Sequence, residues 1–194
     1  MLCIIETQIG RDRAENLANT LGFDSSFAVD SAGRSGGLVL FWNNEIKVEI
    51  LGYSRFHIDA KICDIGSQPW SLTCFYGEPN WDQKHLSWTY LRNLHGNLTG
   101  PWLVLGDFNE ILVASEKEGR NVRPQQYMQN FRDCVDDCEL QEVTTIGDHF
   151  TWSRGVIRER VDRGLCNEQW AVMFPFAGLI HEHHVHFDHR PILL

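Results

Sequence analysis

The chain has 194 residues, of which 43% are hydrophobic, and its formal charge is −9 at pH 7. This length and apolar content are typical of a folded globular protein and exclude an intrinsically disordered one, so we expect a single domain over residues 1–194. The acidic balance argues against a protein that coats nucleic acid without sequence preference, because phosphate binding draws on lysine and arginine.

The first predicted elements are a strand and a helix. The apolar run Leu2–Ile5 predicts a buried strand. Residues 11–21 follow with the spacing of a short amphipathic helix, and Gly22 ends it, since glycine readily takes the left-handed conformation that terminates helices.

Alternating strands come next. Residues 38–42 and 46–50 read as two strands joined by a turn at Asn43 and Asn44, which predicts an antiparallel hairpin. Residues 56–62 and 70–76 alternate as well, and we expect two further strands there.

The second half alternates helices with short strands. Helical spacing predicts helices over residues 85–98 and 125–140, and an apolar strand follows Pro101 between them. Short strands are expected at residues 151–153, 161–162 and 183–187. Mixed strands with a few interspersed helices indicate an α+β fold, in which two packed sheets are flanked by helices.

Cysteine usage and apolar segment lengths bear on the cellular environment. Six cysteines lie scattered without a CxxC pair, which favours reduced thiols in an intracellular protein. The apolar start is too short for a signal peptide, and no segment approaches membrane-spanning length. We therefore expect no membrane partner, and a nuclear location is compatible with these features.

The segment Leu105–Glu110 is the most informative stretch of the chain. If the strand continues through it, Asp107 and Asn109 point to the same side, because side chains on a strand repeat every second residue. A carboxylate and a carboxamide placed together can hold a water, a hard cation or a phosphate oxygen. An Asp-Asn turn that simply closes the strand is an equally open interpretation.

Other apolar runs also end in residues able to do chemistry. These residues are Glu6, Tyr76, Asp162, Asp188 and His189. Glu6 and Asp188 offer the hard oxygen ligands that Mg²⁺ prefers. His189 can act as an acid, a base or an electrostatic partner for phosphate, and Asp162 could orient it. Together these residue types indicate phosphoryl-transfer chemistry. Arginines in the expected loops, among them Arg123, Arg160 and Arg163, could add a local basic site.

A histidine-rich tract, His181–His186, suggests zinc as an alternative. His184 and His186 would share one strand face with Asp188. Ligands two residues apart on a single strand form an incomplete shell, however, and no second ligand cluster is evident. Solvent-facing histidines on the last strand are therefore the favoured explanation of the tract.

The order of several motifs resembles that of the endonuclease/exonuclease/phosphatase superfamily. The motifs are Ile5-Glu6-Thr7, Phe75-Tyr76-Gly77, Leu105–Asn109, Phe150–Ser153, Glu159–Arg163 and Asp188–Pro191. Within that superfamily the chain looks most like the endonuclease domain of plant LINE-type (non-LTR) retrotransposons. Residues 35–38 and the Asn-x-x-Trp segment Asn167–Trp170 carry that closer resemblance.

The resemblance implies a four-layered α/β sandwich and hydrolysis of a DNA phosphodiester that depends on Mg²⁺, with Mn²⁺ as a substitute. By this resemblance, Glu6 binds the metal with Asp188 assisting, and Asp107 activates or positions water. Asn109 and Tyr76 hold the scissile phosphate.

The remaining roles are also carried over from the family. His189, oriented by Asp162, stabilises the pentacovalent state, and Trp152 lies near the nucleic-acid face. The parent element is expected to fuse such a domain to a reverse transcriptase, and a monomer is favoured.

Two departures from the family pattern lead us to expect reduced or lost activity. The family begins with a strand that carries a Trp-Asn pair, whereas only five residues precede Glu6, so the domain is expected to be N-terminally truncated and to lack its first strand. Phe187 stands where the family usually has serine.

Two alternative functions remain open. One is a phosphatase or small-molecule phosphodiesterase of the same fold, which the acidic charge mildly favours. The other is a catalytically inactive remnant of a mobile element.

Overall fold

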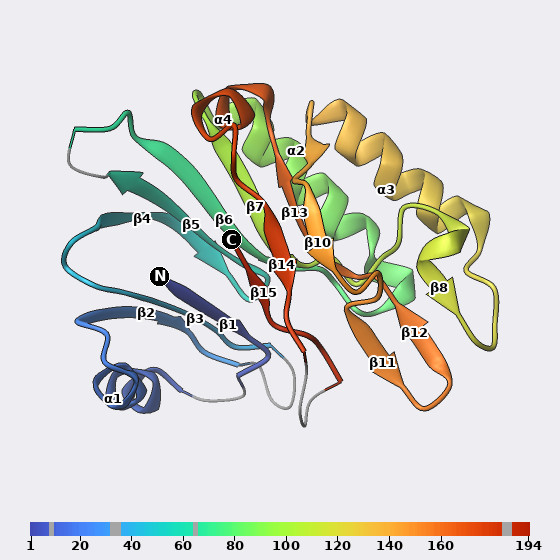
Figure 1. The fold of residues 1–194 in the computed structure, drawn as a ribbon, viewed down its shortest axis with the longest axis horizontal. Helices are drawn as coiled ribbons and strands as arrows, with labels where there is room; N and C mark the ends of the chain where they lie inside the picture. Colours follow the sequence, from blue (N-terminus) through green and yellow to red (C-terminus); the bar gives the residue numbers. More distant parts are fainter. Residues whose placement is uncertain (8–9, 32–35, 64–65, 184–187) are drawn as a thin grey trace. The chain divides into compact units, whose positions relative to one another are not determined.

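The computed structural model describes residues 1–7, 10–31, 36–63, 66–183 and 188–194. The chain forms two compact units, Met1–Tyr76 and Gly77–Leu194 (Figure 1). The elements of the first unit are β1 (Leu2–Ile5), α1 (Arg11–Leu21), β2 (Ser25–Val29), β3 (Leu38–Trp42), β4 (Lys47–Ser54), β5 (His57–Cys63) and β6 (Trp70–Tyr76).

The second unit contains helices on both sides of several short strands. Its helices are η1 (Trp81–Gln83), α2 (His85–Asn97), η2 (Ala114–Glu116), α3 (Gln125–Asp137) and α4 (Glu168–Met173). Its strands are β7 (Trp102–Asp107), β8 (Lys117–Glu118), β9 (Gln141–Glu142), β10 (Thr145–Gly147), β11 (Trp152–Arg154), β12 (Ile157–Glu159), β13 (Asp162–Cys166), β14 (Leu179–His181) and β15 (Ile192–Leu193).

In the first unit, helix α1 covers a sheet with strand order β1-β3-β2. Ala14 and Ala18 of α1 form a buried cluster with Val39 and Phe41 of β3. Gly22 follows the helix in the left-handed conformation, with φ of 80°, as the sequence predicted. The antiparallel strands β4, β5 and β6 form the other sheet region of this unit.

The hairpin expected from residues 38–42 and 46–50 is wrong. Strand β3 pairs with β1 on one edge and β2 on the other, so neither of its edges is open to β4. Strand β4 pairs with β5 instead. The turn in which the Ile46 amide donates to the Asn43 carbonyl, at 3.1 Å, therefore carries the chain into the other sheet. Strand β2 was not predicted, and it takes the edge that the hairpin required.

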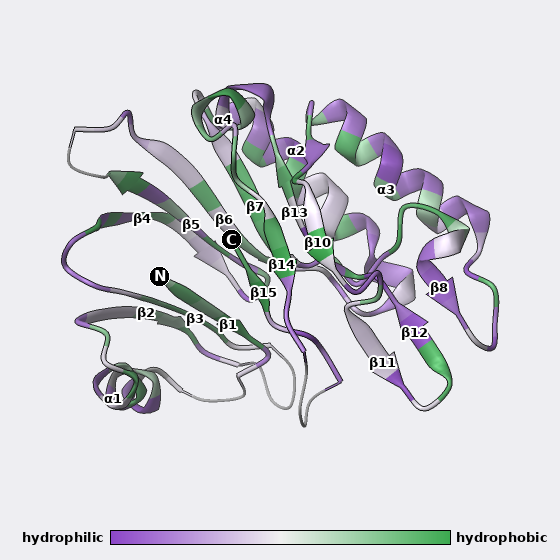
Figure 2. Cartoon of the chain, viewed as in Figure 1, coloured by the Kyte–Doolittle hydropathy of each residue, from purple (hydrophilic) through white to green (hydrophobic). Residues whose placement is uncertain are grey.

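In the second unit, α2 and α3 are joined by an aromatic core. Trp88 of α2 stacks on Phe131 of α3 with ring centroids 4.6 Å apart, and Phe131 stacks on Phe108 at 5.3 Å. Cys134 of α3 and Cys138, which directly follows the helix, are also buried. In Figure 2, β7 and β14 are largely hydrophobic, whereas α3 carries many hydrophilic residues.

The strands of the second unit form mixed and antiparallel pairs. β13 pairs antiparallel with both β7 and β9. β10 runs parallel to β14, which pairs antiparallel with β15, while β12 pairs with β8 and β11. The fold is thus the expected mixed α/β architecture of several sheets packed with helices. Residues 184–187 of the strand expected at 183–187 lie outside the described part of the chain.

Two of the arginines that could have formed a local basic site form ion pairs instead. Arg163 is fully buried, and its guanidinium donates to Glu116 at 2.7 Å and to Glu142 at 2.7 Å. Arg160 reaches the same two carboxylates, at 3.5 and 2.9 Å. These ion pairs connect β13 and the residue segment before it to η2 and β9, because buried charges require partners of opposite sign.

None of the helices in the described ranges is long and apolar enough to cross a bilayer.

Asn167, the first residue of the Asn-x-x-Trp segment, has a structural role. Its Oδ1 accepts from the amides of Trp170 and Trp102, both at 3.0 Å, and its Nδ2 donates to the Gly100 carbonyl at 2.9 Å. The side chain caps α4 and ties it to the start of β7.

We expect Asn167→Ala to lower the free energy of unfolding by about 2–3 kcal/mol, because it removes a helix cap and leaves further backbone groups unpaired. Urea denaturation followed by circular dichroism measures the change. Asn167→Asp keeps the acceptor and should lose less than half as much; an equal loss would contradict the capping role.

Candidate active site

The site is built around two aspartates that face each other across neighbouring strands. Asp107 is the last residue of β7, and its register partner in the antiparallel ladder is Asp162, the first residue of β13. Both are buried. The sequence indicated each of them separately, and strand pairing brings them together.

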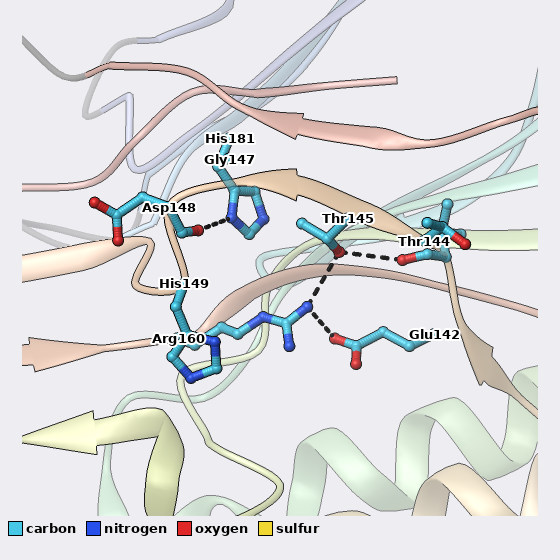
Figure 3. Close-up of a pocket in the computed structure, with 9 residues that line it drawn as sticks. Glu142, Thr144, Thr145, Gly147, Asp148, His149, Arg160 and His181 are labelled. Atoms are coloured by element: carbon cyan, nitrogen blue, oxygen red, sulfur yellow. Dashed lines mark hydrogen bonds and ion pairs between the residues drawn. The ribbon is translucent and has the colours of Figure 1, made fainter.

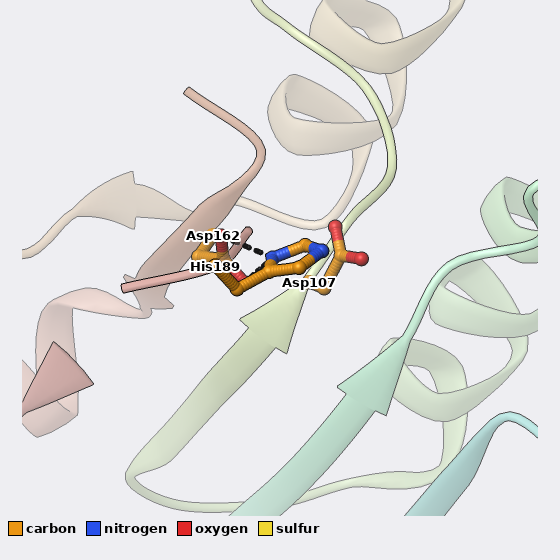
Figure 4. A group of neighbouring side chains, drawn as sticks. All are labelled: Asp107, Asp162 and His189. Atoms are coloured by element: carbon orange, nitrogen blue, oxygen red, sulfur yellow. Dashed lines mark hydrogen bonds and ion pairs between the residues drawn. The ribbon is translucent and has the colours of Figure 1, made fainter. Parts of the chain in front are cut away.

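His189 completes this group. Its Nδ1 lies 3.0 and 3.2 Å from the two carboxylate oxygens of Asp162. Figure 4 shows the imidazole between Asp162 and Asp107. Ligand atoms of the three residues all lie within 4.8 Å of one another, and no other such group occurs among the described residues.

The neighbouring carboxylates determine the charge of His189. Burial acts to lower its pKa, but the hydrogen bond and charge of Asp162 outweigh this effect. With the added charges of Asp107 and Asp188, the pKa of His189 rises to about 9. The ring is therefore an imidazolium at neutral pH, suited to stabilising negative charge on a phosphoryl group.

Strand β11 holds the segment that carries His189. Residues Trp152 and His189 form an isolated antiparallel bridge. The Ser153 amide donates to the Asp188 carbonyl at 2.8 Å, and the Arg190 amide donates to the Thr151 carbonyl at 2.7 Å. The Phe-Thr-Trp motif therefore sets the position of the Asp-His motif through backbone hydrogen bonds.

Thr151 is a site residue that the sequence reasoning missed. It is fully buried, and its Oγ1 accepts from the amides of Val161 and Asp162, at 3.1 and 2.9 Å. One hydroxyl thus fixes the backbone of Asp162 while the same residue's carbonyl holds Arg190, next to His189. Thr151 lies within the motif Phe150–Ser153, but that resemblance assigned a role to Trp152 alone.

Asp107 and Asn109 meet in a turn and not on one continuous strand face. Asn109 has φ of 53°, in the left-handed region, so the strand alternation breaks there. Its amide donates to Asp107 Oδ1 at 2.7 Å. Its side-chain Nδ2 donates to the Gly77 carbonyl at 2.9 Å. The backbone therefore forms the turn that the sequence left open as an alternative. This turn brings the Asp107 carboxylate to the backbone amide of Asn109.

In the first unit, Glu6 and Tyr76 are brought together. Glu6 directly follows β1, Tyr76 is the last residue of β6, and the Tyr76 hydroxyl donates to Glu6 Oε1. Glu6 has φ of 54°. The Tyr76 hydroxyl therefore orients this carboxylate from the end of another strand.

Asp188 and Trp152 form another side-chain pair. Trp152 Nε1 donates to Asp188 Oδ2 at 3.2 Å, and Asp188 is exposed. Trp152 is half-buried, and it packs against the buried cluster of Ile111, Met128 and Val161.

The donor groups present suit a hard divalent cation better than zinc. Glu6 and Asp188 are carboxylates, each oriented by a single side-chain donor, and carboxylate oxygens are preferred Mg²⁺ ligands. The His189 imidazolium is a poor ligand, because its Nδ1 is committed to Asp162. The positions of His184 and His186, named for the zinc alternative, lie outside the described residues.

His181, from the same tract, was expected to face solvent, but it does not. It is buried, and its Nδ1 lies 2.7 Å from the Asp148 carbonyl. It lines a polar pocket of about 410 Å³ together with Asp148, Arg160 and others (Figure 3). Its Nε2 has no hydrogen-bond partner among the described residues, a position that a water molecule can fill.

The pairing of His189 with Asp162 predicts an unusual titration. By ¹H–¹⁵N NMR of the metal-free protein, the His189 ring should titrate with a midpoint near pH 9. In Asp162→Asn the midpoint should fall, because the hydrogen bond and charge of Asp162 are lost while burial still lowers the pKa and only Asp107 and Asp188 oppose it. An unchanged midpoint in this variant would contradict the assignment.

The same pair makes folding stability depend on pH. The pKa of His189 is higher in the folded chain than in the unfolded chain, so proton binding favours folding. Its stabilising contribution is complete below about pH 6.5 and is lost as the pH rises toward 9. The urea midpoint should fall over this window in the wild type, and the fall should be smaller in His189→Gln.

Thr151→Val should destabilise the chain by about 2–4 kcal/mol, because two buried amides lose their acceptor. It should also lower the His189 titration midpoint, since Asp162 is then less well held. Thr151→Ser keeps the hydroxyl and should preserve both properties; a valine variant with an unchanged His189 midpoint would limit Thr151 to a packing role.

Solved structures confirm the fold. The endonuclease domain of TRAS1, a telomere-specific non-LTR retrotransposon, is 13% identical and covers 99% of this chain and 96% of its own, with a TM-score of 0.69. The 3′ phosphatase NExo from Neisseria, bound to product DNA hairpin, is 16% identical, with coverages of 98% and 86% and a TM-score of 0.70. An AP endonuclease from Archaeoglobus fulgidus is 14% identical, with the same coverages and a TM-score of 0.70.

Sequence comparison identifies the family. No curated protein matches the chain at a significant level. The profile of the Endonuclease/Exonuclease/phosphatase family, however, matches residues 1–179. Because this match spans most of the sequence, the chain belongs to that family, whose members are divalent-metal-dependent hydrolases of phosphoester bonds.

Proposed function

We propose that this chain is a DNA-nicking endonuclease of retrotransposon origin. The observation that carries the proposal is the charged His189 imidazole set between Asp162 and Asp107. A fixed cation beside a second carboxylate provides what phosphodiester hydrolysis needs, which is a group to position water and a group to stabilise the phosphoryl charge.

In the proposed reaction, one water adds to phosphorus while the bond to O3′ breaks. Asp107 positions the water and accepts its proton. The His189 imidazolium, held by Asp162, stabilises the charge on the phosphoryl oxygens. The cut strand then ends in a 3′-hydroxyl and a 5′-phosphate.

Asn109 and Tyr76 would bind the phosphate. Asn109 Nδ2 uses one hydrogen on the Gly77 carbonyl and has a second to donate. The Tyr76 hydroxyl also donates to Glu6. Tyr76 would therefore both bind the phosphate and orient the Glu6 carboxylate.

Glu6 and Asp188 are the proposed ligands of Mg²⁺, for which Mn²⁺ could substitute. When bound, the ion would act as a Lewis acid that neutralises phosphate charge. In the chain itself, Tyr76 and Trp152 each donate one hydrogen bond to these carboxylates and so orient them.

DNA as the substrate is supported by the relatives. The similar TRAS1 domain is the endonuclease of a non-LTR retrotransposon, and NExo was solved with product DNA. Trp152 offers an indole ring beside Asp188 that could lie near a nucleic-acid strand. The parent element would carry a reverse transcriptase.

Nicking of supercoiled plasmid in the presence of Mg²⁺ tests the proposal. Because reduced activity is expected for this chain, open-circle product should form slowly, and EDTA should abolish it. Asp107→Asn should lower the residual rate by at least a further factor of about 10², because it removes the group that accepts the proton. Asp136→Asn, at an exposed site on α3, is the matched control and should cut at the wild-type rate.

The substrate panel separates the competing functions. Release of phosphate from a 3′-phosphorylated oligonucleotide or an inositol phosphate, without nicking, would replace the endonuclease by a phosphatase. Absence of all three activities in a folded sample would indicate an inactive remnant.

A further inference from the structure

Lys84 is a buried cation that contacts the loop of residues 107–110, which contains Asn109. Only 3% of the residue is exposed, although lysine is rarely buried unless it is paired. It immediately precedes α2, in helical conformation, so the helix fixes the direction of its stem. Its ammonium Nζ donates to the backbone carbonyl of Asn109.

Two loops of the second unit are joined by a short series of hydrogen bonds. The Gly77 amide donates to the Asp107 carbonyl at 2.7 Å, and Asn109 Nδ2 donates back to the Gly77 carbonyl at 2.9 Å. A Cβ at Gly77 would lie 2.3 Å from the Phe108 carbonyl oxygen, so the loops approach as closely as glycine permits. Lys84 provides the third link, to the carbonyl of Asn109.

The Asn109 backbone needs such support. Its φ of 53° is uncommon for a residue other than glycine, although asparagine tolerates this conformation better than most residues. An ammonium on its carbonyl gives a charge-assisted hydrogen bond, which is stronger than one between neutral groups. The charge also acts on the neighbouring Asp107 carboxylate.

The surroundings of Lys84 keep its charge in place. Glu110 is fully buried, and its Oε2 lies 3.7 Å from Lys84 Nζ. Arg123 Nε lies 3.0 Å from the other oxygen of Glu110. Both cations also lie over the ring of Trp81, with centroid distances of 5.6 Å for Lys84 and 4.7 Å for Arg123. The carboxylate and the aromatic face offset part of the cost of burying the ammonium, although burial still lowers the pKa of Lys84.

We propose that Lys84 is a positioning residue for the loop of residues 107–110, which contains Asn109. Its buried ammonium holds the Asn109 carbonyl and thereby fixes the orientation of the Asn109 carboxamide. The inference rests on the proposed function for Asn109. It extends that function to a residue outside the motifs of the family resemblance.

The second unit contains a matched control. Lys117 is also largely buried and pairs with a carboxylate, Glu159, which Arg123 contacts as well. The Lys117 ammonium binds this carboxylate, whereas the Asn109 carbonyl is held by Lys84. Lys117→Met therefore removes a buried ion pair of the same kind without removing the link to Asn109.

The test compares Lys84→Met, Lys84→Arg and Lys117→Met with the wild type in two measurements. The first is the steady-state nicking rate. We expect kcat to fall on the order of 10²-fold in Lys84→Met with KM nearly unchanged, because a small displacement of a reacting group has costs of that size. Lys84→Arg keeps a cationic donor and should recover most of the rate, and Lys117→Met should match the wild type per folded molecule.

The second measurement does not depend on activity. In asparagine-labelled protein, the Asn109 side-chain amide signals, assigned through Asn109→Asp, should shift in Lys84→Met and exchange faster with solvent. They should remain in place in Lys117→Met. If the wild type cuts no substrate, the proposed function fails, and these signals still decide whether Lys84 positions Asn109.

Folding failure is addressed by a double variant. Lys84→Met alone leaves Glu110 with one cation fewer, so Lys84→Met/Glu110→Gln removes both charges of the pair. It should restore thermal stability while the Asn109 signals and kcat remain altered. Unchanged Asn109 signals in a folded Lys84 variant, or an equal loss of kcat in Lys117→Met, would overturn the inference.

Discussion

The antiparallel register of β7 and β13 is the constraint on which the candidate active site depends. It sets Asp107 opposite Asp162 at the end of the ladder, where two buried carboxylates would repel each other. His189 resolves this conflict by carrying positive charge between them, with a pKa raised to about 9. The aspartates thus keep the histidine charged, and the histidine makes their proximity tolerable.

Several side chains of the candidate active site are positioned by groups that have no proposed chemical role. Thr151 holds the backbone of Asp162, and Trp152 orients the Asp188 carboxylate. Lys84 in the same way holds the backbone carbonyl of Asn109. Buried ion pairs add little net stability because desolvation is costly, but they restrict geometry, and a reacting centre benefits from such restriction. This explains why so many paired charges lie in the second unit near the site.

The local elements and the candidate residues were largely predictable from sequence. Apolar runs and helical spacing predicted α1, α2 and α3 and most of the longer strands, because these signals depend on near neighbours. The errors lie in pairing. The hairpin expected from β3 and β4 was wrong because β2, a short strand with little alternation, competes for the same edge. His181 was expected in solvent and is buried.

The sequence by itself determined the family, the element types and the identity of Asp107, Asp162 and His189 as candidates, because these are properties of residue order and local spacing. Only the tertiary structure decided which strands pair, that the three residues meet, and that Thr151 and Lys84 support them. Strand register and burial depend on contacts between segments far apart in the chain. A threonine or a lysine acquires a positioning role only when distant segments place a backbone carbonyl or amide beside it.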